Sequence, residues 1–236
     1  MRISRREFVE SSAVSVAGLY LLGSSRFSGG GTCAAAEGDC VLLDLGADCK
    51  LRESLRGYQE ALETNAISVQ EIRNWRQRLL LVVPGMAALT MESTAMRVLL
   101  GFLEAGTRVL LESGAGFSTA EEFAIHRDML RDAFDVRVQS PVEVRSRAAD
   151  GMASAGAPYV EYGWPCRTWV RDFSRAIPVV AAQTDVIGQA GKMPVAIRKR
   201  VGKGTLIFLG SPVGPALFAG DLEARAWLRS LTTAFV

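Results

Sequence analysis

A carboxylate and a hydroxyl stand side by side near the middle of the chain, where an apolar run ends in a glycine-rich turn. Glu112 and Ser113 follow the apolar segment 107–111 and precede the turn 114–116. A serine hydroxyl becomes a nucleophile when a neighbouring base removes its proton, and a carboxylate can serve as acid or base. Ser113 and Glu112 are therefore the candidate catalytic residues, and the reaction would be a hydrolysis at this turn.

The chain has a single histidine, His126, which is the natural base for Ser113. It falls about two turns into the helix predicted after the turn, and a helix advances about 1.5 Å per residue. We therefore expect the helix to carry His126 away from Ser113. In that case Ser113 caps or lines a turn, and His126 is a partly exposed helix residue.

Glu112 needs a partner, because an isolated carboxylate at the end of an apolar strand is costly to bury. Arg167, Arg171 or the backbone amides of the glycine-rich turn could supply one, which would make its role structural. The other interpretation is a ligand site at Glu112 and Gly114, since a turn before a helix can hold an anion. The turn lacks the spacing of a dinucleotide or phosphate loop, so we expect no cofactor.

Aromatic and basic side chains gather in segment 159–171, whose members are Tyr159, Tyr162, Trp164, Arg167, Trp169 and Arg171. Rings beside polar groups suit stacking against a sugar or a partner surface. Tyr162, Trp164 and Arg167 are the candidate ligand contacts. The alternative is that these rings cover the edge of a sheet and fill the core.

Buried strands and helices alternate along the first part of the chain. Apolar runs predict strands at 41–45, 79–83, 107–111 and 136–139, and apolar spacing predicts helices at 50–63, 69–75, 90–105 and 118–134. Runs that are apolar on both faces indicate central strands of a parallel sheet that helices cover on both sides.

The second part of the chain is richer in strands. β segments are expected at 158–162, 168–173 and 178–183, after a flexible loop at 147–157. Segments 193–200 and 205–209 predict a hairpin with glycines in its turn, and 221–231 a terminal helix. The sequence predicts one three-layer α/β domain whose mostly parallel sheet ends in a C-terminal antiparallel hairpin.

Ligands of open α/β sheets bind beyond the carboxyl ends of the strands. This rule selects the polar residues and glycines that end the predicted strands, which are Asp44, Asp48, Gly85, Glu112, Ser113 and Ser211. We therefore expect a small-molecule site at this edge of the sheet.

Three segments resemble the class I glutamine-amidotransferase-like superfamily, whose sheet is flavodoxin-like. They are the strand and glycine turn at 79–85, the strand and turn at 107–116, and the hairpin that ends at Gly210 and Ser211. The family's enzymes carry a cysteine at the second turn and a histidine and a glutamate near the end of the domain. Here that turn has no cysteine, and the closing region has no histidine. A cysteine-dependent glutaminase is therefore excluded.

The first 36 residues are typical of a twin-arginine export signal. Arg5 and Arg6 precede an apolar pair, a weakly apolar stretch follows, and a small-x-small site predicts cleavage after Ala36. A lipid anchor at Cys33 fits poorly because the expected leucine is missing before it. The apolar stretch is too short for a stable membrane span. We expect residues 37–236 to form a single domain, periplasmic or secreted, whose partner during export is the twin-arginine translocase.

Without the leader the chain has no net charge. The 27 basic and 25 acidic residues become 23 of each, because the leader holds four arginines and two glutamates. A nucleic-acid partner is therefore not expected.

The cysteines fit no zinc motif, and no metal site is expected. Cys49 and Cys166 both lie in loops after strands and are predicted to form a disulfide in an oxidising compartment, the alternative being separate thiols.

Three functions remain open at this point. The leading hypothesis is an exported, non-catalytic amidotransferase-like domain that binds a small ligand, such as a carbohydrate, or a protein partner. The alternative is a hydrolase that uses Ser113 or Glu112. The third is a structural subunit that docks through the aromatic segment.

Overall fold

The computed structural model describes residues 40–46, 49–72, 80–86, 89–114, 116–143, 159–172 and 175–234. The export signal with Arg5, Arg6 and Cys33 lies outside these ranges, as do Asp48 and the predicted loop at 147–157. Ala115 and the end of the predicted helix at 69–75 also lie outside them.

A nine-stranded mixed sheet forms the centre of the domain, in the order β2-β1-β3-β4-β13-β12-β11-β7-β8. Its parallel part holds β1 (Cys40–Asp44), β2 (Ile67–Ser68), β3 (Leu80–Met86), β4 (Arg108–Ser113) and β13 (Gly204–Leu209). Its antiparallel part holds β12 (Met193–Val201), β11 (Val186–Ala190), β7 (Tyr159–Tyr162) and β8 (Thr168–Arg171). The predicted fold class is confirmed, and the antiparallel part is larger than the predicted hairpin.

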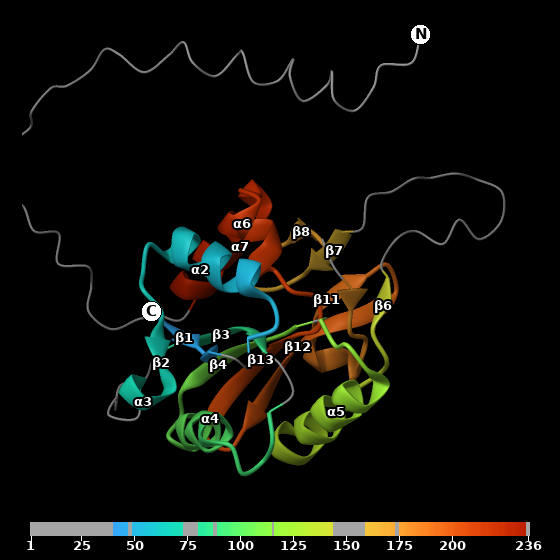
Figure 1. The fold of residues 1–236 in the computed structure, drawn as a ribbon. Coiled ribbons are helices and arrows are strands. Elements are labelled where there is room, and N and C mark those ends of the chain that lie inside the picture. The colour runs from blue at the N-terminus through green and yellow to red at the C-terminus, as the bar shows by residue number, and fades with distance from the viewer. Residues whose placement is uncertain are drawn as a thin grey trace, which may run out of the picture. The chain divides into compact units, whose positions relative to one another are not determined.

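Helices cover both faces of this sheet (Figure 1). On one face lie α2 (Arg52–Leu62), α6 (Gly214–Phe218) and α7 (Leu222–Thr233). On the other lie α4 (Thr94–Glu104) and α5 (Ala120–Phe134), and the short α3 (Val69–Ile72) follows β2. No helix within the described ranges is long and apolar enough to span a membrane.

Short strand pairs lie beside the main sheet. β5 (Arg137–Val138) pairs with β10 (Val179–Val180), and β6 (Val142–Glu143) pairs with β9 (Arg175–Ala176). A 3₁₀ turn, η2 (Gln183–Asp185), leads from β10 into β11. The strand predicted at 136–139 is thus a member of a small side ribbon and not of the main sheet.

The central strands have the burial that their apolar runs predict. All seven residues of β3 and the last five residues of β4 are buried. Each fully buried Leu or Val side chain contributes about 1.5–3 kcal/mol relative to exposure. This core fixes the carboxyl ends of β3, β4 and β13, where the candidate residues lie.

Candidate functional site

Glu112 and Ser113 end β4, and their side chains lie on opposite faces of the sheet. Successive residues of a strand alternate between faces. Glu112 contacts the α6 side, where the amides of Val213 and Gly214 donate to it, and Ser113 contacts His126 of α5. Since α6 and α5 cover opposite faces (Figure 1), the two candidate catalytic residues do not share one site.

The Glu112 carboxylate is completely buried and accepts three backbone hydrogen bonds. Oε1 accepts from Gly85 N at 3.1 Å, and Oε2 accepts from Val213 N at 3.0 Å and Gly214 N at 2.9 Å. Gly85 has a φ of 55°, a conformation that favours glycine and directs this amide inward. The carboxylate therefore joins the ends of β3 and β4 to the start of α6.

Burial raises the pKa of Glu112 above its usual value. The hydroxyls of Ser54 and Tyr58 on α2 oppose this shift together with the amides of Gly214 and Gly85. Both hydroxyls are buried beside the carboxylate. A carboxylate enclosed in this way can stabilise loops, and no solvent-exposed surface of it is available to a ligand.

The partners of Glu112 differ in part from those predicted. Its amide donors come from the end of β3 and the start of α6 and not from its own glycine-rich turn. Arg167 lies elsewhere, with NH2 2.8 Å from Oε1 of Glu161. The structural role expected for Glu112 is therefore supported, and Arg167, one of the partners considered for it, pairs with Glu161 instead.

Ser113 and His126 meet, contrary to the prediction. Ser113 Oγ lies 2.7 Å from His126 Nε2, and both residues are 0% exposed. The connection from Gly114 to Thr119 accounts for the difference. It leaves six residues between β4 and α5, and the 2.7 Å contact shows that His126, about two helical turns into α5, lies at the level of Ser113.

The serine–histidine pair is covered by aromatic side chains. The ring of Phe117 packs on His126 with centroids 4.8 Å apart, and on Phe123 with centroids 5.4 Å apart. Glu122, one turn before His126, accepts from Ser118 N at 2.8 Å and pairs with Lys50 at 2.7 Å. These contacts lower the pKa of Glu122, with a smaller contribution from the charge of His126. The pair has the chemistry of a nucleophile and base but no access to substrate.

The remaining candidates at the sheet edge also make structural contacts. Asp44 Oδ1 accepts from Gly46 N at 2.8 Å and pairs with Arg52 at 3.1 Å. Gly114 N donates to Met86 O at 3.0 Å. Ser211 Oγ donates to Asp172 Oδ2 at 3.0 Å, and both residues are buried. The ligand site expected beyond the strand ends is thus occupied by the protein's own groups at these positions.

The aromatic segment divides between the inside and the outside of the β7–β8 hairpin. Tyr162 is fully buried, and its ring packs 4.8 Å from that of Trp227. Trp164 is half-buried beneath Arg198, whose guanidinium lies 4.5 Å from the ring centroid. The interpretation that rings fill the core holds for Tyr162.

The outer face of the hairpin carries Tyr159, Glu161, Trp169 and Arg171, and Arg167 lies beside it. Tyr159 lies opposite Arg171, and Glu161 lies opposite Trp169. Tyr159 and Trp169 are 45% and 48% exposed, although rings of this size are usually covered. We call these five residues the outer hairpin face.

The predicted disulfide is not formed. Cys40, Cys49 and Cys166 carry thiols, and the buried Cys49 Sγ donates to Pro84 O at 3.7 Å, beneath the end of β3. Cys166 follows β7, which four strands separate from β3 in the sheet order. The two cysteines therefore belong to different parts of the sheet. Among the described residues no cluster of side chains could hold a metal ion.

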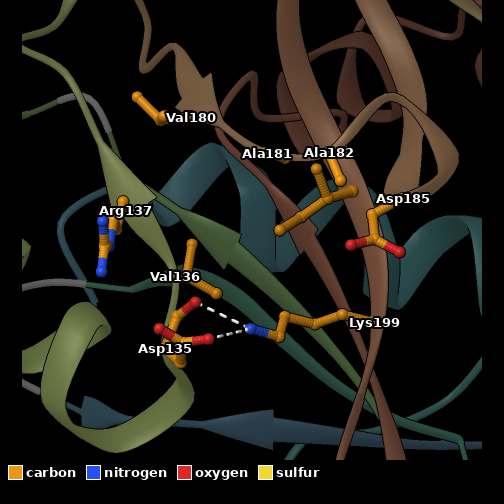
Figure 2. Close-up of a pocket in the computed structure, with 9 residues that line it drawn as sticks. Asp135, Val136, Arg137, Val180, Ala181, Ala182, Asp185 and Lys199 are labelled. Carbon is orange, nitrogen blue, oxygen red and sulfur yellow. Dashed lines mark hydrogen bonds and ion pairs between the residues drawn. The ribbon is translucent and has the colours of Figure 1, made fainter.

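A cavity that the sequence did not indicate lies between the end of α5, β5, β10, η2 and β12 (Figure 2). Its volume is about 320 Å³, and charged side chains line it, among them Asp135, Arg137, Asp185 and Lys199. Its residues come from three separate parts of the chain, so no motif or spacing could have revealed it.

Comparisons with known proteins give the fold. No family model and no curated protein matches the sequence. Cytoplasmic protein STM1381 from Salmonella typhimurium LT2 is similar, with a TM-score of 0.57 and 10% identity over 84% of this chain and 99% of that chain. Exo-β-1,4-mannosidase Op5Man5 from Opitutaceae bacterium strain TAV5 has a TM-score of 0.53 and 10% identity over 84% of this chain.

A β-galactosidase from Rahnella sp. R3 has a TM-score of 0.50 and 10% identity, again over 84% of this chain. The chain spans 35% of the mannosidase and 31% of the galactosidase, about a third of each. At such identities the likeness shows the fold and no activity. The chain thus has the class I glutamine-amidotransferase-like fold that its three segments resemble.

Proposed function

We propose that this chain is an exported, non-catalytic domain that binds carbohydrate on the outer hairpin face. A contrast in exposure carries the proposal: Glu112, Ser113 and His126 are each 0% exposed, whereas Trp169 and Tyr159 are about half exposed. A nucleophile must reach its substrate, and a recognition side chain must be accessible to its ligand. The nucleophile at the turn after β4 is not accessible to a substrate. The rings on the hairpin are accessible to a ligand.

The spacing of the two rings suits a short oligosaccharide. Tyr159 and Trp169 are diagonal neighbours on paired strands, because Tyr159 lies opposite Arg171 and Trp169 lies opposite Glu161. Diagonal neighbours are roughly 7–8 Å apart. Two rings at this separation on one face of a sheet can each stack against the apolar face of a sugar ring.

Polar groups beside the rings can bind the hydroxyl groups of a sugar. The Arg167 guanidinium lies 5.3 Å from the Trp169 ring and 2.8 Å from the Glu161 carboxylate. Glu161 is thereby held next to the ring and retains lone pairs to accept hydrogen bonds. This arrangement of stacking surface and oriented polar groups favours a neutral, hydroxyl-rich ligand over a charged one.

Two further observations agree with this assignment. Two of the similar structures are a mannosidase and a galactosidase, in which the matching part is about a third of the chain. Arg5 and Arg6 support export by the twin-arginine translocase, which would place the domain in the periplasm or outside the cell. Carbohydrate polymers are available in both places.

Binding of mannan, galactan and cell-wall oligosaccharides by the full chain tests the proposal. We expect at least one of these glycans to raise the melting temperature, and Trp169→Ala to weaken its binding about tenfold or more, since stacking energy and buried area are lost together. Phe218→Ala removes a ring of α6 that is 42% exposed and should leave affinity unchanged. Absence of any glycan binding would refute the proposal. If the wild type instead captures a protein that Trp169→Ala does not capture, the ligand of the outer hairpin face is a protein and not a carbohydrate.

A hydrolase is the second candidate function, and the 2.7 Å contact between Ser113 and His126 favours it. Catalysis would require Phe117 to move so that substrate reaches the serine. Activity on generic ester or amide substrates that Ser113→Ala abolishes would establish this function. We expect no such activity, because Ser113 and His126 are both 0% exposed.

A further inference from the structure

The cavity beside α5 has an ion pair that leaves a donor unused. Lys199 of β12 donates from Nζ to the backbone O of Asp135 at 2.7 Å and to its Oδ2 at 3.0 Å. Asp135 ends α5 with a φ of 50°, and the hydrogen bond and charge of Lys199 lower its pKa. An ammonium group has three N–H donors, so among the described residues one donor of Lys199 has no acceptor.

A carboxylate without a protein partner lines the same cavity. Asp185 of η2 is half-buried, and within the described residues its carboxylate makes neither a hydrogen bond nor an ion pair. Figure 2 shows it above the side chain of Lys199, while the ion pair of Lys199 with Asp135 lies at the other end of that side chain. A half-buried carboxylate that has no protein partner can accept charge-assisted hydrogen bonds from a cationic group of a ligand.

The charges around the cavity are balanced, which argues against a ligand of one sign. Asp135 and Asp185 are matched by Arg137 and Lys199. Arg137 is exposed and lies opposite Val180 on the β5–β10 ribbon, so its guanidinium is open to an anion. The two carboxylates would repel a ligand that is only an anion, and Arg137 and Lys199 would repel a ligand that is only a cation.

The size and the apolar part of the wall limit the ligand further. A volume of about 320 Å³ is at the small end of ligand pockets. The wall includes the buried Ile197 and the exposed Val180, which can contact a short aliphatic group.

We propose that this cavity binds a small zwitterion of the amino-acid class, with its ammonium on Asp185 and its carboxylate on Arg137 and the remaining donor of Lys199. The site is independent of the outer hairpin face, and either assignment can hold without the other.

Calorimetric titration of the full chain with L-leucine and 5-aminopentanoate tests the site, with pentylamine and pentanoate as single-charge controls. We expect at least one zwitterion to bind about tenfold more tightly than either control, because each end adds a charge-assisted hydrogen bond. Asp185→Asn should weaken binding of the zwitterion about tenfold and leave binding of pentanoate unchanged. Arg137→Gln should weaken binding of both pentanoate and the zwitterion and leave binding of pentylamine unchanged.

Two control variants separate this site from the rest of the molecule. Glu60→Gln removes an exposed carboxylate of α2, which does not line the cavity, and should bind as the wild type does. Trp169→Ala should also bind normally. Failure of both zwitterions to bind saturably would overturn the proposal, as would binding that neither Asp185→Asn nor Arg137→Gln weakens.

Discussion

Glu112 and Ser113 are adjacent in the chain, yet one binds the amides at the start of α6 and the other binds His126 of α5, on the opposite face of the sheet. The end of β4 therefore holds two separate buried polar contacts. Each can be removed without the other, and each makes its own prediction about stability.

Glu112→Gln should lower the free energy of unfolding by roughly 2–3 kcal/mol. The carboxylate accepts three amide hydrogen bonds, and a carboxamide would present an N–H₂ group to at least one of these amides. Chemical denaturation measures this change. Glu161→Gln, a solvent-exposed carboxylate on the hairpin, is the control and should change stability by less than about 0.5 kcal/mol. Equal effects of the two variants would show that Glu112 does not join the loops.

The stabilisation by Glu112 should depend on pH in a defined direction. Because burial raises its pKa, the folded protein keeps this proton at pH values where the unfolded chain has lost it. Linkage then lowers the free energy of unfolding as pH rises from the ordinary carboxyl range through the raised pKa. Glu112→Gln cannot lose this proton, so the difference in unfolding free energy, wild type minus variant, should grow as pH falls through the raised pKa toward the ordinary carboxyl range. A difference that shrinks as pH falls would contradict the assignment.

The Ser113–His126 contact should appear as coupling in a double-mutant cycle. Ser113→Ala leaves the buried Nε2 without its hydroxyl partner and should cost about 1–3 kcal/mol. Once His126→Leu has removed the imidazole, the same serine substitution should cost about 1 kcal/mol less. Urea unfolding of the four proteins gives the coupling energy, and Ser118→Ala at an exposed position is the control. Additive effects would mean that the contact contributes nothing to stability.

The strands and helices of the parallel part could be predicted because their signals are local. The apolar runs at 41–45, 79–83 and 107–111 correspond to β1, β3 and β4, and the glycine turn at 202–204 joins β12 to β13. β11 has no such local signal, because Val186–Ala190 contains a glycine and a glutamine and only two of its residues are buried. Its register with β12 is also irregular, so no clean alternation marks it.

The candidate site could be predicted only in part, because its contacts link distant residues. The sequence indicated that Glu112 must have polar partners, but Val213 and Gly214 lie about a hundred residues further along the chain. Alternation along a strand already implies that Glu112 and Ser113 face opposite ways. The meeting of Ser113 with His126 depends on the length and path of the connection before α5, which residue spacing does not define.

The packing of α2 against α6 gives a test of the fold itself. A Cβ on Gly57 would lie 2.1 Å from Gly214 O and 2.7 Å from Phe218 N, so Gly57→Ala must push the two helices apart. We expect a loss of about 2 kcal/mol or more in unfolding free energy. Gly101→Ala is the matched control on α4, where nothing lies within 4 Å of the added atom. It should stabilise the protein by about 0.5–1 kcal/mol, through helix propensity. Stabilisation by both substitutions would contradict the contact.

Titration of the best-binding glycan against Trp169→Ala and Ser113→Ala, side by side, tests the central claim most directly. If the outer hairpin face is the binding surface and the turn after β4 is sealed, Trp169→Ala loses about tenfold or more in affinity and Ser113→Ala binds as the wild type does. The reverse result, with binding intact in Trp169→Ala and lost in Ser113→Ala, would place the ligand at the serine–histidine pair and contradict the account.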